Sequence, residues 1–151
     1  MNLDFSVIQN QKNLLAFSAG VDSSALFFLL LEQSIPFDIA IVNYNLRVQS
    51  KDEVFYAKNL ASKYKKNIFL KETKIENISN FEKNARDIRY KFFDEIILEN
   101  SYENLITAHQ LNDKLEWFMM QLSKGAGLVE LIGFNEFEQK ENHKIYKPLL
   151  N

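Results

Sequence analysis

Short apolar runs alternate with longer amphipathic stretches along the chain, and this pattern predicts strands that alternate with helices. The runs that predict buried strands are Asn13–Phe17, Ile39–Val42, Ile68–Leu70 and Asn104–Thr107, with Lys144–Leu150 as a candidate for a last strand. Strands separated by helices of ten or more residues are typical of βαβ crossovers. We therefore expect an α/β protein, with a mostly parallel sheet that carries helices on both faces.

Four helices are predicted between these strands. Val21–Glu32 is apolar nearly all round, so this helix should be packed on more than one side. Ser50 and Glu53 have the spacing of a capping box at the start of the second helix. The apolar stripes of the remaining helical stretches are Val54, Ala57, Ala61 and Tyr64; Ala85, Ile88, Phe92 and Ile96; and Leu115, Phe118, Met119 and Leu122.

Composition narrows the class of protein. The 151 residues, of which 46% are hydrophobic and 25% charged, suit a single globular domain. The absence of cysteine excludes disulfides, thiolate metal sites and cysteine nucleophiles, and it favours an intracellular, cytoplasmic protein. The longest apolar run, Ala25–Leu31, is far shorter than the roughly 20 residues of a membrane span, so no membrane association is expected. The four glycines form neither a GxGxxG nor a GxxxxGK[ST] motif.

Charge is distributed unevenly along the chain. The formal net charge is −2, but Arg47–Lys91 holds 12 basic and six acidic residues. One interpretation is that lysines such as Lys58, Lys63, Lys65 and Lys66 form the solvated face of a helix. The other is a patch that faces nucleic acid.

Polar clusters follow three of the predicted strands, where an open α/β sheet binds its ligands. They are Ser18–Ser24, Asn43–Arg47 and Ala108–Asp113. The first places three hydroxyls and several N–H groups at the start of a helix, which favours phosphate binding. Asp22 would oppose such an anion unless a divalent cation lay between them. The alternative is a plain N-cap made by Ser18 or Ser23.

The six residues Ser18-Ala19-Gly20-Val21-Asp22-Ser23 resemble the SGGxDS pyrophosphate loop of the PP-loop ATP pyrophosphatase family. That resemblance implies an adenine nucleotide alpha hydrolase-like fold and an enzyme that activates a substrate oxygen as an adenylate. It also implies that all six residues bind ATP, and that Asp22 is catalytic and helps to place Mg²⁺. Ala19 stands where the family usually has glycine, which suits the loop if φ at this residue is negative.

Five further segments are similar, in the same order, to motifs of the tRNA(Ile)-lysidine synthases within that family. They are Ile41–Arg47, similar to Val-Asp-His-Gly-Leu-Arg; Asn84–Tyr90, similar to Ala-Arg-x-x-Arg-Tyr; Thr107–Glu116, similar to Thr-Ala-His-His-x-x-Asp-x-x-Glu; and Ser123–Gly127 with Lys147–Leu149, similar to Arg-Gly-x-Gly and Arg-Pro-Leu. The reaction that this resemblance implies attaches L-lysine to the wobble cytidine of tRNA(Ile) with a CAU anticodon, and it consumes ATP.

The resemblance also implies roles for individual side chains. Arg86 would offset charge that develops on the phosphate, His109 would contact nucleotide or cytidine, and Asp113 with Glu116 would hold the substrate lysine. The residues alone leave other interpretations open. Arg86 and Arg89 are spaced for one helix face and could be surface ion-pairing residues, His109 could be structural, and both acids could lie in solvent.

Two other functions stay open at this point. One is a different PP-loop ligase or tRNA-modifying enzyme, although the lack of cysteine disfavours thiolation. The other is a degenerate ATP-binding module, which the departures at Ala19, Asn43 and Tyr44 suggest. The resemblance further leads us to expect that residues 1–151 are a truncated catalytic domain without tRNA-binding domains. The oligomeric state, a homodimer included, is left open.

Overall fold

The computed structural model describes residues 4–45, 49–75, 78–108 and 136–150, and these form one six-stranded sheet. The strands are β1 (Asn13–Ala16), β2 (Asp38–Asn43), β3 (Ile68–Glu72), β4 (Asn104–Ile106), β5 (Phe137–Gln139) and β6 (Lys144–Tyr146). Their order in the sheet is β3-β2-β1-β4-β6-β5. All neighbouring strands are parallel except β5, which runs antiparallel to β6.

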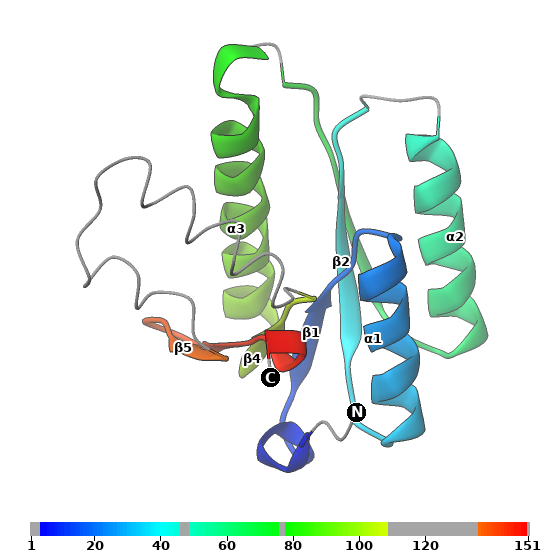
Figure 1. The fold of residues 1–151 in the computed structure, drawn as a ribbon, viewed down its shortest axis with the longest axis vertical. Coiled ribbons are helices and arrows are strands. Elements are labelled where there is room, and N and C mark those ends of the chain that lie inside the picture. The colour runs from blue at the N-terminus through cyan, green and yellow to red at the C-terminus, as the bar shows by residue number, and fades with distance from the viewer. Residues whose placement is uncertain (1–3, 46–48, 76–77, 109–135, 151) are drawn as a thin grey trace.

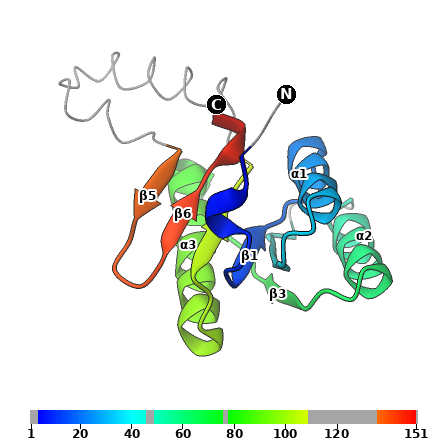
Figure 2. The same cartoon turned by 90° about the horizontal axis from the view of Figure 1, so that it is seen from below.

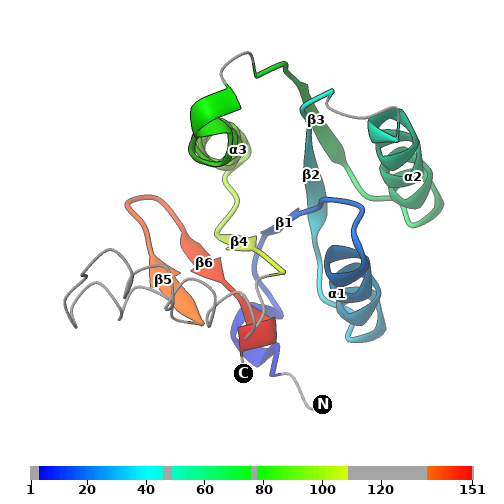
Figure 3. The same cartoon turned by 45° about the horizontal axis from the view of Figure 1, so that its top comes forward.

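Within the described ranges, three helices cover the sheet: α1 (Val21–Glu32), α2 (Ser50–Lys63) and α3 (Phe81–Asn100). Figure 1 shows α1 and α2 on one face and α3 on the other, and Figure 3 shows the sheet between these layers. Each helix has an apolar stripe, so each face of the sheet is closed by its own core. The predicted α/β architecture, with helices on both faces, is confirmed.

The strand residues divide between the two cores by alternation. Leu15 and Ile106 pack toward α1 and α2, whereas their neighbours Leu14 and Leu105 pack toward α3. This follows from the period of two in a β-strand, since successive side chains point to opposite faces. A strand that is buried on both sides therefore appears in the sequence as a continuous apolar run, as predicted.

The structure departs from the predicted elements at three places. β5 was not predicted, because Phe137-Glu138-Gln139 is short and mostly polar, as an edge strand can be. Residues 144–150 are not all strand, since β6 ends at Tyr146 and a 3₁₀ turn follows at Pro148–Leu150. α2 begins at Ser50 with Gln49 as its N-cap, one residue before the N-cap that the capping-box spacing predicted.

The helix predicted from Leu115 to Leu122 lies outside the described residues. Among the residues that are described, no helix is long and apolar enough to cross a membrane.

The strand order fixes where a ligand can reach the sheet. From β1 the chain moves outward to β2 and β3, and it then returns to the other side of β1 for β4. The carboxyl ends of β1 and β4 thus flank the point where the direction of winding reverses, which is where open α/β sheets bind ligands. Figure 2 shows the β5–β6 hairpin beyond β4, on the side away from α2.

Candidate functional site

The segment Ser18–Ser23 joins the carboxyl end of β1 to the start of α1, at this reversal point. Two serine side chains hold it together. The Oγ atoms of Ser18 and Ser23 are 3.0 Å apart, and Ser23 Oγ also accepts a hydrogen bond from the Ser18 amide at 3.2 Å. Ser23 is buried, so its hydroxyl organises the loop from inside.

The first turn of α1 is left without a side-chain cap. Its N-cap residue is Gly20, which has no side chain, so the plain N-cap predicted as an alternative for Ser18 or Ser23 is wrong. A Cβ atom added at Gly20 would come within 3.3 Å of Ser18 Oγ, which is a tight contact. Both residues that follow, Val21 and Asp22, are exposed. Uncapped amides, a positive helix end and open space together make a site that fits a phosphate group.

Ala19 has a φ of 63°, in the left-handed region. The condition under which alanine would suit the loop, a negative φ, is therefore not met. This conformation costs an L-residue roughly 1–2 kcal/mol relative to the right-handed region. Ala19 is half-buried and packs against the core on the α1 side of the sheet, so its surroundings hold it there.

The loop after β2 contains a second residue of this kind, Asn45, with a φ of 55°. Its backbone N–H donates to Asn43 Oδ1 at 3.0 Å, and Asn43 Nδ2 donates to Asn45 Oδ1 at 3.2 Å. Asn45 Nδ2 donates in turn to the carbonyl oxygen of Thr73, beyond the end of β3. We call these two residues the asparagine clasp, because they join the ends of β2 and β3.

Tyr44 lies between the two asparagines and connects the clasp to α3. Its hydroxyl donates to the carbonyl oxygen of Ala85 at 3.0 Å, and its ring lies edge-on to Phe81 with the centroids 6.1 Å apart. Burial raises the pKa of Tyr44, and the charge of Arg89 together with a hydrogen bond from it opposes that rise. The hydroxyl therefore binds two successive turns of α3.

The two arginines of the Ala-Arg-x-x-Arg-Tyr segment lie on α3, one turn apart, as predicted. Arg86 is exposed, and its guanidinium carbon is 5.7 Å from the centre of the Tyr90 ring. Arg89 is half-buried beside Tyr44. The first half of α3 thus carries two cations near the carboxyl end of β2.

A buried lysine lies at the carboxyl end of β6, in the other half of the sheet. Lys147 follows β6, is 5% exposed, and its Nζ lies 3.3 Å from Glu138 Oε2 on β5. Lys140 approaches the other oxygen of this carboxylate at 2.6 Å. The two cations hold the pKa of Glu138 below its usual range despite the opposing effect of burial. The Arg-Pro-Leu-like segment therefore begins with a cation that is fixed at the carboxyl end of β6.

Several predicted site residues lie outside the described residues. These are His109, Asp113 and Glu116, together with Arg47. Across the ranges that the structure does describe, no three histidine or acidic side chains converge into a metal site. The carboxylate of Asp22 beside the uncapped helix end still fits Mg²⁺, because this ion often takes one or two protein carboxylates and completes its shell with water and phosphate oxygens.

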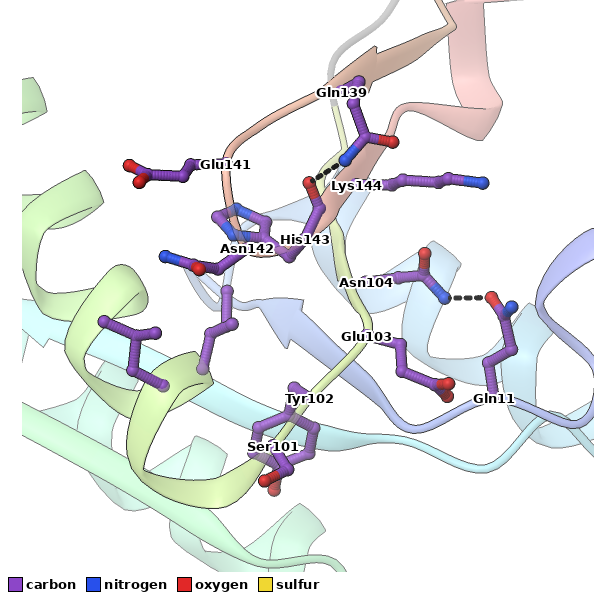
Figure 4. A pocket seen from close by; sticks show the side chains of 12 residues that line it. Gln11, Ser101, Tyr102, Glu103, Asn104, Gln139, Glu141, Asn142, His143 and Lys144 are labelled. Atoms are coloured by element: carbon purple, nitrogen blue, oxygen red, sulfur yellow. Dashed lines mark hydrogen bonds between the residues drawn. The ribbon is translucent and has the colours of Figure 1, made fainter.

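A separate hollow of about 530 Å³ lies at the opposite, amino edge of the sheet (Figure 4). Its walls come from the end of α3, the starts of β4 and β6 and the β5–β6 turn. His143 lines it and is buried, and its Nε2 atom has no hydrogen-bond partner among the described residues, with Asp94 Oδ1 3.8 Å away. None of the predicted site residues that the structure describes lines this hollow, so the candidate site stays at the carboxyl edge.

Sequence reasoning missed the contacts made by Asn45, by the Tyr44 hydroxyl and by Lys147. The signal for Asn45 was present, since asparagine tolerates the left-handed region and stands where the similar motif has glycine. The Tyr44 hydroxyl contacts a residue 41 positions away in the chain, which no local pattern indicates. Lys147 contacts Glu138 across the β5–β6 pair, and β5 itself was not predicted.

Comparison with known proteins shows which family this chain matches and which proteins it resembles. A family model described as a PP-loop domain matches residues 3–151. A tRNA(Ile)-lysidine synthase of Campylobacter jejuni is 52% identical over 146 residues, which are 96% of this chain and 45% of that protein. One of Helicobacter hepaticus is 53% identical over 150 residues, covering 96% of this chain and 35% of that protein. The chain thus spans less than half the length of these relatives.

A solved structure is similar in fold. It is the U34-tRNA thiolase NcsA from Methanococcus maripaludis with its [4Fe-4S] cluster, with a TM-score of 0.78 and 23% sequence identity. The match covers 97% of this chain and 54% of that one. At this level of identity the likeness concerns the fold alone.

Proposed function

The chain belongs to the PP-loop family, and from this premise we propose that it is the ATP-binding catalytic domain of a tRNA(Ile)-lysidine synthase. The reaction is the attachment of lysine to C2 of the wobble cytidine of tRNA(Ile) with a CAU anticodon, with release of AMP and pyrophosphate. We place it in the cytoplasm. The observation that carries the proposal is the loop of residues 18–23, in which the Ser18 and Ser23 hydroxyls are hydrogen-bonded to each other and the following helix has no side-chain cap.

The loop residues supply the phosphate site in this proposal. Ser18, Ala19 and Gly20 shape the turn, and the amides that begin α1 at Val21 and continue through Asp22 and Ser23 point their N–H groups at phosphate oxygens. Asp22 holds Mg²⁺, which supplies positive charge that balances the phosphates when bound. The Ser23 hydroxyl keeps the loop in shape, because it is buried and already bonded to Ser18.

The reaction needs a better leaving group at C2 of cytidine than a carbonyl oxygen. Transfer of the AMP group from ATP to that oxygen provides it, since AMP then departs when the lysine ε-amine attacks C2. Electrostatic stabilisation of the transferring phosphate supplies much of the rate in such reactions. We assign this role to Arg86, which is exposed on α3 near the carboxyl ends of the strands.

The remaining roles rest on the resemblance in residues 107–116. We propose that His109 contacts the nucleotide or the cytidine, and that Asp113 and Glu116 bind the ammonium group of L-lysine. The position of the segment supports this, because it follows β4, whose carboxyl end lies beside that of β1. Paired carboxylates suit a cation that must later be released as a neutral nucleophile.

The direct test is mass spectrometry of tRNA(Ile) with a CAU anticodon after incubation with the chain, ATP and lysine. We expect a mass increase at the wobble cytidine that depends on ATP and on lysine. Pyrophosphate release only with another acceptor would point to a different PP-loop ligase, and ATP binding without turnover would point to a degenerate module.

A second test addresses the loop. Asp22→Ala should lower ATP consumption at least about a hundredfold, because it removes the charge that places the metal at the transferring phosphate. Asp52→Ala is the matched control, since Asp52 is also an exposed aspartate in the first turn of a helix, but in α2. ATP consumption by Asp22→Ala at the parental rate would exclude the loop assignment.

A further inference from the structure

The asparagine clasp holds the segment after β2 in a single conformation. Asn43 and Asn45 exchange two hydrogen bonds, and Asn45 makes a third to the Thr73 carbonyl oxygen. The Thr73 amide donates back to the Asn43 carbonyl oxygen at 2.9 Å. Tyr44 lies between the two asparagines, so its backbone is fixed on both sides.

Tyr44 extends from this fixed segment to α3. Its hydroxyl donates to the carbonyl oxygen of Ala85, and the charge of Arg89, one turn further along, acts on the same hydroxyl. Its ring also contacts Phe81, the first residue of α3. Figure 1 shows this first part of α3 at the same end of the molecule as the carboxyl end of β2. Tyr44 therefore links the carboxyl end of β2 directly to the first turns of α3.

Those turns carry two arginines whose surroundings differ. Arg86 is exposed and lies near the Tyr90 ring, so its guanidinium stays open to solvent on one side. Arg89 is half-buried and close enough to Tyr44 for its charge to lower the pKa of that hydroxyl. Two guanidinium groups one helical turn apart can bind phosphate oxygens through several parallel hydrogen bonds, provided that their helix is held in a fixed position relative to the sheet.

We propose that Tyr44 is a positioning residue that fixes Arg89 and Arg86 as a two-arginine phosphate ligand at the carboxyl edge of the sheet. The inference rests on the proposed function, which brings phosphate groups to this edge in ATP and in the tRNA backbone. The shared chemistry is a phosphate oxygen, and the test separates the two sources.

The test compares the binding of three probes by calorimetry or NMR titration: Mg-ATP, adenosine and a CAU anticodon stem-loop RNA. Tyr44→Phe keeps the ring contact with Phe81 but removes the hydroxyl that binds Ala85 and Arg89. We expect the affinity for one of the two phosphate-bearing probes to fall about three- to tenfold, which is the size expected when one hydrogen bond is lost. Adenosine carries no phosphate, so its affinity should stay unchanged.

A double-mutant cycle shows whether the hydroxyl acts through the arginine. In an Arg86→Ala/Arg89→Ala background, Tyr44→Phe should cause little further loss, because both groups that it positions are already absent. Tyr64→Phe is the matched control, because Tyr64 lies directly after α2, at the carboxyl-terminal end of that helix. It should change none of the three affinities.

The outcomes separate the inference from the proposed function. If the parental chain binds neither Mg-ATP nor the RNA, the proposed function is contradicted and the inference falls with it. If the parental chain binds and Tyr44→Phe leaves both affinities unchanged, only the inference is overturned. An equal loss for adenosine, or an equal loss in the presence and absence of the two arginines, also overturns it, because Tyr44 would then act on the fold in general.

Discussion

The loops that follow β1 and β2 both place a residue other than glycine in the left-handed region, but they hold it there by different means. Asn45 has a side chain that bonds to Asn43 and to Thr73, so its conformation is stabilised by the groups around it. Ala19 has only a methyl group, which packs against the core. The similar family motifs usually have glycine at both positions.

The difference shows what replaces glycine when a backbone conformation must be kept. Asparagine is tolerated in the left-handed region and adds hydrogen bonds, so the loop after β2 gains rigidity from its substitution. Alanine adds no polar contact, so the loop after β1 keeps its shape against a local penalty. In our proposal the loop after β2 positions α3, whereas the loop after β1 binds phosphate.

The largest effect is expected from Asn45→Val. A β-branched residue is strongly disfavoured at this φ, and the contacts to Asn43 and Thr73 disappear with the amide. We expect the free energy of unfolding to fall by about 2–3 kcal/mol in urea titration. Asn45→Gly keeps the backbone conformation and should cost less than about 1 kcal/mol. Equal losses for the two variants would show that backbone conformation is not what Asn45 preserves.

A smaller effect is expected from Asn43→Asp, which introduces the residue that the similar motif usually has. A carboxylate can still accept from the Asn45 amide, but its second oxygen would face Asn45 Oδ1, where Asn43 now donates at 3.2 Å. We expect a loss of about 1–2 kcal/mol at neutral pH.

The double variant Asn43→Asp/Asn45→Gly should recover most of that loss, since no side-chain oxygen then faces the carboxylate. Additive losses in this double-mutant cycle would contradict a coupled clasp.

Ala19→Gly should have the opposite sign. Removing the methyl group relieves the left-handed penalty, which outweighs the lost packing and the greater freedom of the unfolded chain. We expect stability to rise by up to about 1 kcal/mol, seen as an increase of a few degrees in Tm. Ala25→Gly, at an exposed position inside α1, is the control and should lower stability by about 1 kcal/mol. A drop in Tm for both variants would show that the methyl contact matters more than φ.

The smallest effect concerns pH and should not distinguish the two loops. Burial lowers the pKa of His143 below 6.5, although Asp94 on α3 and Glu138 on β5 favour the charged form and Lys140 opposes it. The unfolded chain therefore binds a proton more readily than the folded one, so stability should fall as the pH drops through 6.5 and stay level above it.

This loss should be the same for the parental chain, Ala19→Gly and Asn45→Gly, because His143 lies at the amino edge of the sheet. His143→Gln should remove its share of the slope in urea titrations between pH 7.5 and pH 5.5. An unchanged slope would mean that His143 titrates alike in both states.

Periodicity and short motifs were enough to predict β1, β2, β3, β4 and all three described helices. These elements bury one stripe or two faces over many residues, and such burial leaves a regular pattern in the sequence. β5 escaped prediction, because an edge strand of three mostly polar residues has no such pattern. The capping-box spacing at Ser50 and Glu53 placed the N-cap of α2 one residue too late, because a local spacing marks a helix start only to within a residue or two.

The candidate site was likewise predictable only in the features that depend on residues close together in the chain. The sequence by itself determined the fold class, the polar segment Ser18–Ser23 between a strand and a helix, and the two arginines one turn apart, since each depends on residues close together in the chain. Only the tertiary structure decided that Ala19 and Asn45 take left-handed conformations, and that the Tyr44 hydroxyl binds the carbonyl oxygen of Ala85, 41 residues away. The physical reason is that these conformations and contacts are set by the packing of separate elements, which local sequence preferences do not specify.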